Sequence, residues 1–188
     1  MSVIEGEEMI FYHVVSDRPK YAGQRFRVDE EHPNGVYERV QAQMEIVKDI
    51  YKNPEKYEGT ELEHSVDVAL RELALEKVRK EKYQQYPSRM AALYVSKTYE
   101  EAEQWADYFA SLGRPTYSVA KIKVNGRYYI GDACKCFDGT VLEEENLRLA
   151  EIYWLNEPNE DGQKEIVEVL VDGEIEVVEI MKELNANV

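Results

Sequence analysis

The sequence is poor in cysteine, with only Cys134 and Cys136 among its 188 residues. This pair cannot build the disulfide framework of a small secreted domain, so the composition favours a cytoplasmic protein. The spacing is also too short for the paired cysteines of a zinc site, which stand about two to four residues apart. His13, His32 and His64 lie far away in the sequence. We therefore expect no bound metal and interpret both cysteines as packing or loop residues.

Positive charge is also scarce. Lys and Arg number 23 against 38 Asp and Glu, which gives a net charge of −15. Such a charge repels phosphate at long range, which argues against duplex nucleic acid as a partner but leaves room for a local basic pocket. No apolar run approaches the roughly 20 residues of a membrane-spanning helix. The acidic start, MSVIEGEEM, lacks the basic residues of a secretory signal. We expect neither a membrane span nor export.

Familiar catalytic and nucleotide-binding patterns are missing as well. The chain has no GxGxxG, Walker A, HExxH, GxSxG or EF-hand pattern.

The size and the order of the predicted elements indicate one α+β domain over residues 1–188. Apolar runs predict strands over 9–15, 91–95, 116–124, 127–130, 166–171 and 174–180. Helical spacing and capping patterns predict helices from Val36 to the stop at Asn53-Pro54, from Thr60 to Tyr86-Pro87, from Thr98 to Gly113, and over 143–154. This irregular order favours antiparallel pairing over a doubly wound parallel sheet.

Two turn signals divide the C-terminal half. Asn125-Gly126 lies between apolar stretches and both residues tolerate positive φ, so it predicts a β-hairpin. Asp172-Gly173 predicts a second hairpin or a tight strand connection. The predicted core comprises Ile10, Leu70, Leu93, Trp105, Phe109, Val119, Ile122, Val169 and Ile180.

Three features point to chemistry, and the first two lie at predicted strands. His13 stands in the apolar first strand, where an imidazole needs a hydrogen-bond partner. A hydrogen-bonded core histidine is the plain alternative. Arg89 leads into the strand over 91–95 and is suited to bind an anion or phosphate. A surface ion pair is the alternative for Arg89, and Tyr94 in that strand also fits a core position.

The third feature is Glu168 in the strand Ile166–Leu170. Alternate side chains share a face, so this carboxylate lies between Ile166 and Leu170, and the other face is apolar too. A partly buried carboxylate is costly unless a cation offsets its lost hydration, and such groups concentrate at functional sites. The alternative is an edge strand whose face is open to water.

The order of these features resembles the His-Tyr-Glu branch of the ADP-ribosyltransferase superfamily. Tyr12-His13-Val14-Val15 is similar to its first motif, and Leu93-Tyr94-Val95-Ser96, followed by the helix after Thr98, is similar to its second. Glu168-Val169-Leu170-Val171 resembles its third motif in the form seen in DNA ADP-ribosyltransferase toxins. The whole chain is similar to a family of uncharacterised bacterial and phage proteins grouped with this fold, which shows YHVV, HPNGVYE, YPSRM, LYVS, AEQWA and EVLVDG in this order.

The resemblance implies a split antiparallel β-sandwich with flanking helices and NAD, as substrate, in its cleft. Glu168 would be the catalytic carboxylate, bonding the nicotinamide ribose and activating the acceptor. His13 would bond the ribose hydroxyls of the adenosine half, and Tyr94 would stack on the nicotinamide ring. Tyr12 and Ser96 belong to the same motifs, and the charge of Arg89, or else of Arg18 or Arg25, would suit the pyrophosphate.

The expected function is an NAD-dependent ADP-ribosyltransferase, or an NAD glycohydrolase on the same site. A carboxylate beneath the sugar stabilises the oxocarbenium-like charge and can accept the proton of the incoming group. The alternative is a non-catalytic member of the fold that binds a nucleotide or a protein, since fold does not fix function. A nucleic-acid mimic is disfavoured because the carboxylates are spread over amphipathic helices. The acceptor stays open among a protein, a nucleotide, a small molecule and water.

Overall fold

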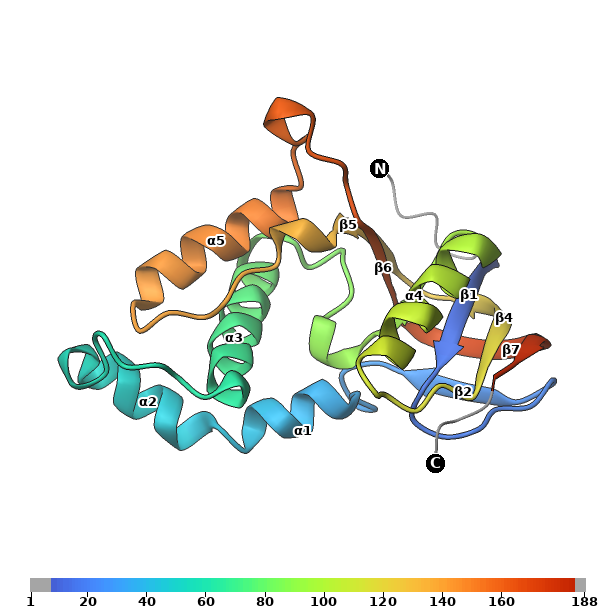
Figure 1. Cartoon of the computed structure of the whole chain (residues 1–188), viewed down its shortest axis with the longest axis horizontal. Helices are drawn as coiled ribbons and strands as arrows, with labels where there is room; N and C mark the ends of the chain where they lie inside the picture. The colour runs from blue at the N-terminus through green and yellow to red at the C-terminus, as the bar shows by residue number, and fades with distance from the viewer. Residues whose placement is uncertain (1–7, 185–188) are drawn as a thin grey trace.

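The computed structural model describes residues 8–184 and has the mixed element order of an α+β chain (Figure 1). The strands are β1 (Met9–Val15), β2 (Arg25–Val28), β3 (Leu93–Val95), β4 (Ser118–Asn125), β5 (Tyr128–Asp132), β6 (Val167–Val171) and β7 (Gly173–Glu183). The α-helices are α1 (Gly35–Gln41), α2 (Met44–Lys52), α3 (His64–Lys82), α4 (Tyr99–Ser111) and α5 (Glu143–Leu155). The α+β class is confirmed.

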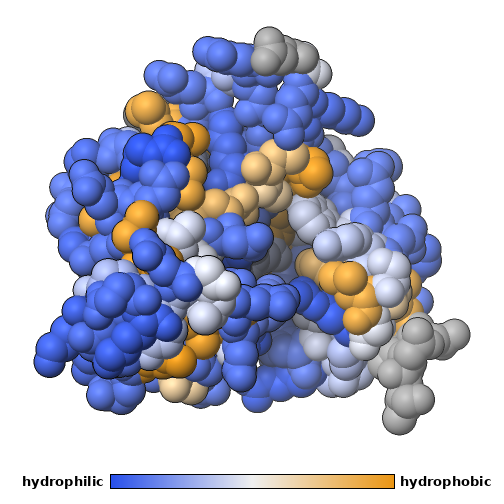
Figure 2. Space-filling model, turned by 60° about the vertical axis from the view of Figure 1, so that its left-hand side comes forward, coloured by the Kyte–Doolittle hydropathy of each residue, from blue (hydrophilic) through white to orange (hydrophobic). Residues whose placement is uncertain are grey.

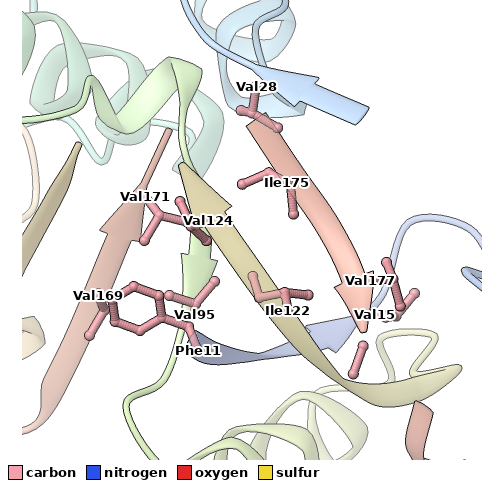
Figure 3. Packing of buried hydrophobic residues seen from close by; sticks show 11 residues of the cluster. Phe11, Val15, Val28, Val95, Ile122, Val124, Val169, Val171, Ile175 and Val177 are labelled. Atoms are coloured by element: carbon pink, nitrogen blue, oxygen red, sulfur yellow. The ribbon is translucent and has the colours of Figure 1, made fainter. Parts of the chain in front are cut away.

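The strands build two antiparallel sheets that face each other. Four strands pair in the order β1-β4-β7-β2, and three pair in the order β3-β6-β5. One apolar core lies between the sheets. It includes Phe11, Ile122 and Ile175 from the larger sheet and Val95 and Val169 from the smaller one (Figure 3). Burial of this shared core is what holds the two sheets together.

Helices cover the outer faces of both sheets. On the three-stranded sheet, Leu75 of α3 and Trp154 of α5 pack in one cluster with Leu170 of β6. On the four-stranded sheet, Ala102 of α4 packs with Val119 of β4. Figure 1 accordingly shows α4 against the four-stranded sheet and the other helices gathered at the opposite end of the molecule.

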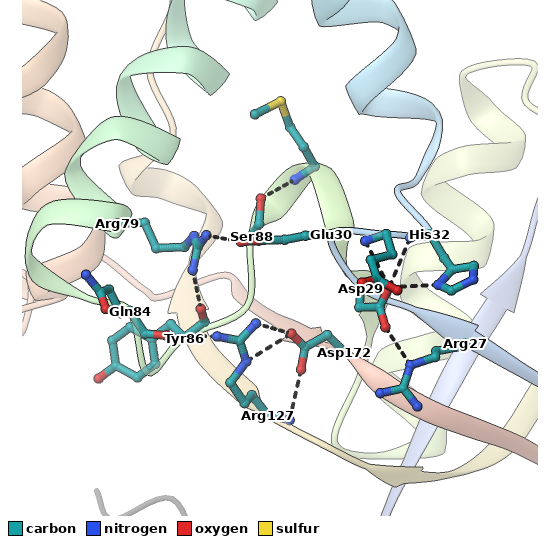
Figure 4. A network of polar contacts seen from close by, with 12 residues as sticks. Arg27, Asp29, Glu30, His32, Arg79, Gln84, Tyr86, Ser88, Arg127 and Asp172 are labelled. Carbon is teal, nitrogen blue, oxygen red and sulfur yellow. Dashed lines mark hydrogen bonds and ion pairs between the residues drawn. The ribbon is translucent and has the colours of Figure 1, made fainter.

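The two sheets are joined at a corner. Here two neighbouring connections, the two crossings, each take the chain from one sheet to the other. β4 runs into β5 through Gly126 and Arg127, and β6 runs into β7 at Asp172, although each pair is divided between the two sheets. The Asp172 carboxylate accepts hydrogen bonds from the backbone N–H of Arg127 at 2.9 Å and from its Nη2 at 2.5 Å (Figure 4). This contact pins the two crossings to each other.

The corner shows that the β-hairpin predicted at Asn125-Gly126 is wrong. The flanking strands do not pair with each other, because β4 pairs with β1 and β7, whereas β5 pairs with β6. The chain does bend at Asn125-Gly126, but the neighbouring connection from β6 to β7 bends beside it, at Asp172-Gly173. The pairing of β4 with β7 therefore continues in the second sheet as the pairing of β5 with β6. The tight strand connection expected at Asp172-Gly173 is confirmed, and Gly173 has a φ of +98°.

Two helix predictions also need correction. The helix predicted from Val36 is broken into α1 and α2, because a turn between them lets both pack against α3. The helix predicted from Thr60 begins only at His64, since the Thr60 hydroxyl donates to the Tyr57 carbonyl at 2.6 Å and does not cap the helix. The cap at Thr98 is confirmed, because its side chain accepts from the N–H of Glu101 at 3.2 Å.

The predicted core is mostly confirmed. Full burial is found for Leu70, Val119, Ile122 and Val169. Partial burial is found for Leu93, Trp105, Phe109 and Ile180. The prediction for Ile10 is wrong, because this side chain is exposed. Alternation along β1 directs Phe11 into the core between the sheets and Ile10 toward the opposite face.

An ion-pair network around Arg79 connects α3 to the segment that leads into β3. Arg79 of α3 is buried, and its Nη2 donates to Glu30 at 2.6 Å, in the connection between β2 and α1 (Figure 4). Its Nη1 donates to the carbonyl of Tyr86 at 3.0 Å. Arg79 thereby fixes the chain a few residues before Arg89.

The face of the molecule in Figure 2 is dominated by hydrophilic side chains, with separate hydrophobic patches between them. The exposed apolar residues include Tyr108 on α4, Leu112 directly after that helix, and Ile152 and Leu155 on α5. Within residues 8–184, none of the helices is both long and apolar enough to cross a membrane.

The corner predicts that Gly126→Ala strongly destabilises the protein. The added Cβ would lie 1.9 Å from the Asp172 carbonyl oxygen, a backbone atom that cannot retreat without separating the two crossings. We expect the free energy of unfolding, measured by urea denaturation, to fall by about 2–4 kcal/mol. Gly35→Ala, at the first residue of α1, is the control because its nearest contact is 3.7 Å away on an arginine side chain. Equal losses in the two variants would contradict this role of the corner.

Candidate functional site

The first and second motifs meet where β1 approaches β3. Tyr12 and Ser96 form an antiparallel bridge, with backbone N–O distances of 3.0 and 2.8 Å. One residue further along β1, Nδ1 of His13 lies 2.8 Å from the carbonyl oxygen of Tyr94. A short backbone bridge and one side chain thus connect the edges of the two sheets.

The contact with Tyr94 determines the state of the His13 ring. A carbonyl oxygen can only accept, so Nδ1 must carry the proton. His13 is 9% exposed, and burial lowers its pKa to about 4, which leaves the ring neutral at neutral pH. Nε2 is then a hydrogen-bond acceptor, and no described residue bonds it. Since every fully buried side-chain nitrogen or oxygen of the described residues has a partner, Nε2 keeps contact with solvent.

Glu168 points from β6 toward α3 and α5, on the face that strand alternation predicts. Its side chain is 11% exposed. Oε1 accepts hydrogen bonds from Nη1 of Arg89 and, at 2.6 Å, from the hydroxyl of Tyr153. Oε2 has no partner among the described residues and therefore also keeps contact with solvent. One carboxylate oxygen is held in place, while the other has no hydrogen-bond partner among the described residues.

Arg89 supplies the cation that this carboxylate needs. It lies buried in a short turn directly before β3. Its Nε donates to Glu72 at 2.9 Å, and its Nη1 donates to Glu168 and, at 2.7 Å, to the Tyr153 hydroxyl. Glu72 is itself buried and accepts from Arg71 Nε at 3.0 Å. Charges of alternating sign thus compensate one another in the interior.

The electrostatics of Arg89 follow from this arrangement. Burial alone would lower its pKa, but the negative charges of Glu168 and Glu72 raise the pKa of the Arg89 guanidinium well above its ordinary value. Its donors are engaged with Glu72, Glu168 and Tyr153, so the guanidinium lies inside the cluster and faces no open surface.

Tyr94 connects His13 to this cluster. Its ring centroid lies 5.5 Å from the guanidinium carbon of Arg89, within range of a cation–π interaction. Its hydroxyl donates to the Arg89 carbonyl at 3.2 Å, and burial raises the pKa of this hydroxyl. His13, Tyr94, Arg89 and Glu168 therefore form a connected series of contacts across β3. No described hydrogen bond joins His13 to Glu168 directly.

The sequence-predicted residues divide into two groups. Tyr12, His13, Arg89, Tyr94, Ser96 and Glu168 all lie along or beside β3. Arg18 and Arg25 are exposed, and Arg25 pairs with Glu176 at 3.1 Å. The surface ion pair considered for Arg89 is wrong because its ion pairs are buried. His13 approaches β3 from the side of the four-stranded sheet, whereas Glu168 lies on the helix side.

Sequence reasoning missed Glu72 and Tyr153. Glu72 lies three residues from each of the buried Ala69 and Leu75 on α3, so a charge inside an apolar helix face was the available signal. Tyr153 precedes the buried Trp154 near the end of α5, and a tyrosine there is equally compatible with plain packing.

Among residues 8–184, no group of three or more His, Cys, Asp or Glu side chains is arranged to hold a metal ion. Cys136 packs beside the cluster, and burial raises the pKa of its thiol to about 11. The thiol is therefore protonated at neutral pH and is not an activated nucleophile.

Comparison with known proteins gives a family for the chain. Residues 11–183 match a family model described as "Protein of unknown function (DUF2441)". The chain belongs to the DUF2441 family. The matched region contains every residue of the site described above. No curated protein matches this DUF2441 chain.

We expect Arg89→Met to lower the free energy of unfolding by about 3–5 kcal/mol, because Glu72 and Glu168 would be left buried without their shared cation. Urea denaturation measures the loss. Adding Glu168→Gln removes one of the two stranded charges and should recover part of it. Arg148→Met, which removes an exposed pair with Glu145 on α5, is the control and should cost at most about 1 kcal/mol. Equal costs for the two single variants would show that the cluster is not a compensated buried network.

His13 predicts a pH dependence of stability. Its pKa is about 4 in the folded protein against an ordinary 6.5, so between these values only the unfolded chain binds the proton. The stability contributed by neutral His13 is therefore complete above about pH 6.5 and is lost as the pH falls toward 4. Between about pH 7.5 and 4.5 the loss should be roughly 2 kcal/mol. His13→Gln cannot titrate, so denaturation at the two pH values should show this loss only in the wild type; parallel losses would contradict the assignment.

Proposed function

We propose that this DUF2441 protein is an NAD-dependent ADP-ribosyltransferase, or an NAD glycohydrolase on the same site, with Glu168 as catalytic carboxylate. The observation that carries the proposal is the state of this side chain. Oε1 is held by Tyr153 and Arg89, while Oε2 has no described partner and keeps contact with solvent. A carboxylate fixed through one oxygen presents the other at a defined position, as electrostatic catalysis requires.

The proposed fold is the ADP-ribosyltransferase-like split β-sandwich. Two facing antiparallel sheets with helices on their outer faces support it. So does the meeting of the Tyr-His strand β1 with the Leu-Tyr-Val strand β3, which in turn pairs with β6. The three motifs are thus carried by strands that follow one another in space.

The chemistry proposed for Glu168 is displacement at the nicotinamide ribose. The bond between the nicotinamide nitrogen and the ribose C1 breaks, and its electron pair leaves with neutral nicotinamide. The sugar becomes oxocarbenium-like, and Oε2 stabilises this charge. An acceptor oxygen or nitrogen bonds to C1, and its proton passes to the carboxylate. Water in the acceptor position gives hydrolysis.

The neighbouring residues suit the two ends of NAD. His13 Nε2 is a neutral acceptor, which matches the hydrogen of a ribose hydroxyl. The Tyr94 ring already lies against one cation, Arg89, and would attract the cationic nicotinamide ring by the same interaction. Tyr12 and Ser96 would fix the two strands through their backbone bridge. The proposed compartment is the cytoplasm, and the acceptor is a protein, a nucleotide, a small molecule or water.

A second candidate is a non-catalytic member of the fold that binds a nucleotide or a protein. One observation favours it: the Arg89 guanidinium forms a direct ion pair with the Glu168 carboxylate. A cation on the carboxylate weakens its attraction for a second cation, whereas a purely structural carboxylate requires such a partner.

The deciding experiment compares Glu168→Gln with the wild type in a nicotinamide-release assay with labelled NAD. Gln keeps the size and the acceptor for Tyr153 but removes the charge. We expect release to fall by about 10²–10³-fold, with the loss in kcat and not in NAD binding. Glu165→Gln, at an exposed position just before β6, is the control and should retain full activity.

Two results would overturn the proposal. Unchanged release by Glu168→Gln would remove this residue from the mechanism. NAD binding by the wild type without any nicotinamide release would support the non-catalytic candidate.

A further inference from the structure

Two adjoining hollows form a groove along α3 and α5, at the helical end of the molecule (Figure 1). The larger, of about 580 Å³, lies between the two helices, and the smaller, of about 420 Å³, continues it toward Tyr51 of α2. Glu81 and Leu147 line both hollows, so the groove is continuous. Along α3 it extends from Leu73 to Lys82, roughly 14 Å at the helical rise per residue.

The floor of the larger hollow is apolar, and part of it is exposed. Val78 and Leu147 line it together with Ile152, which is 42% exposed. Helical spacing places Ile152 on the side of α5 opposite its buried face, as it does Leu155, which is 52% exposed. The buried face of α5 carries Asn146, Ala150, Tyr153 and Trp154. The fold therefore leaves two large aliphatic side chains beside the groove without burial.

The charge along the groove is negative where it is not already compensated. Each lysine or arginine that lines the two hollows has a carboxylate partner. In the larger hollow, Glu81 of α3 and Glu144 of α5 have neither an ion pair nor a side-chain hydrogen bond among residues 8–184. One uncompensated carboxylate thus stands on each wall, above the apolar floor. The compensated pairs are Lys77–Glu143, Lys80–Glu76, Lys82–Glu151 and Arg148–Glu145, at 2.9, 3.4, 2.5 and 2.7 Å.

This combination selects the chemistry of an occupant. Apolar side chains would gain burial on the floor, and cations above them would pair with the two carboxylates. A second copy of the chain would bring the same carboxylates and a net charge of −15. An anionic lipid surface would be repelled for the same reason. Both walls are helices with internally bonded backbones, so an added strand would find no ladder to join, whereas a helix needs none.

We propose that the groove between α3 and α5 is the docking site of a basic amphipathic helix of a partner protein. The aliphatic side chains of this helix would cover Val78, Leu147 and Ile152, and its lysines or arginines would pair with Glu81 and Glu144. This interaction goes beyond the proposed NAD chemistry, and neither proposal depends on the other.

The test is the fluorescence anisotropy of a labelled peptide titrated with the full chain. The probe is a helical peptide of about 14 residues, with leucine along one face and lysine along the other. Ile152→Ser removes an exposed aliphatic side chain and should weaken binding by about 10-fold or more, because its burial is lost. Leu112→Ser, at a 52% exposed position directly after α4, is the control and should bind like the wild type.

The charge contribution has its own matched pair of variants. Glu144→Gln should weaken binding of the lysine peptide by roughly 2- to 5-fold and reduce its dependence on salt. Glu100→Gln, also at the second residue of an α-helix, but of α4, should leave binding unchanged. A peptide with glutamate in place of lysine should bind far more weakly.

No binding of the lysine peptide by the wild type, or equal binding by Ile152→Ser and Leu112→Ser, would overturn the docking site. Equal binding of the lysine and glutamate peptides would overturn its preference for a basic helix. Two measurements without peptide examine other occupants. A wild-type dimer in sedimentation equilibrium that Ile152→Ser dissociates would assign the groove to a second copy instead. Binding to vesicles of phosphatidylcholine and phosphatidylserine that Ile152→Ser abolishes would assign it to a membrane surface.

Discussion

The hydrogen bonds between Asp172 and Arg127 hold two strand crossings together, and the geometry of both sheets depends on them. β4 and β7 lie on one side of this contact, and β5 and β6 lie on the other. β3 takes its place from β6, and β1 reaches β3 through the bridge of Tyr12 and Ser96. Arg127 also donates to the carbonyl of Gln84 at 2.8 Å, in the segment that leads to Arg89. The corner therefore positions the site, although it contributes no side chain to it.

The cluster around Glu168 illustrates how an interior can contain charge. Arg71, Glu72, Arg89 and Glu168 alternate in sign, and Tyr153 bonds to both Arg89 and Glu168. Such a network adds little net stability compared with apolar side chains of the same volume, because each charge loses its hydration. What the network does provide is a fixed orientation: it holds one oxygen of Glu168 and leaves the other without a protein partner.

Local patterns predicted much of this structure. The α+β class, β1, the cap at Thr98 and the position of Glu168 on the same strand face as Leu170 all follow from short-range spacing and side-chain alternation. The sheet change at Asn125-Gly126 does not, because turn chemistry specifies a bend but not the strand that pairs beyond it. Similarly, the sequence offered Arg89 and Glu168 as separate candidates. That they share one buried cluster depends on α3 supplying Glu72 and α5 supplying Tyr153, which no local pattern encodes.

The seam between β1 and β3 has a consequence for motion. Within each sheet, continuous ladders hold the strands, whereas this seam is closed by the two backbone hydrogen bonds between Tyr12 and Ser96 and by the His13 ring. At roughly 1 kcal/mol for each net hydrogen bond, the hydrogen bonds across this seam contribute a few kcal/mol, less than the ladder of either sheet, and the apolar core between the sheets supplies the rest of the attachment. The edges of β1 and β3 can therefore separate locally more easily than the strands within either sheet. The amide protons of Tyr12 and Ser96 should exchange with solvent well before those in the middle of β4.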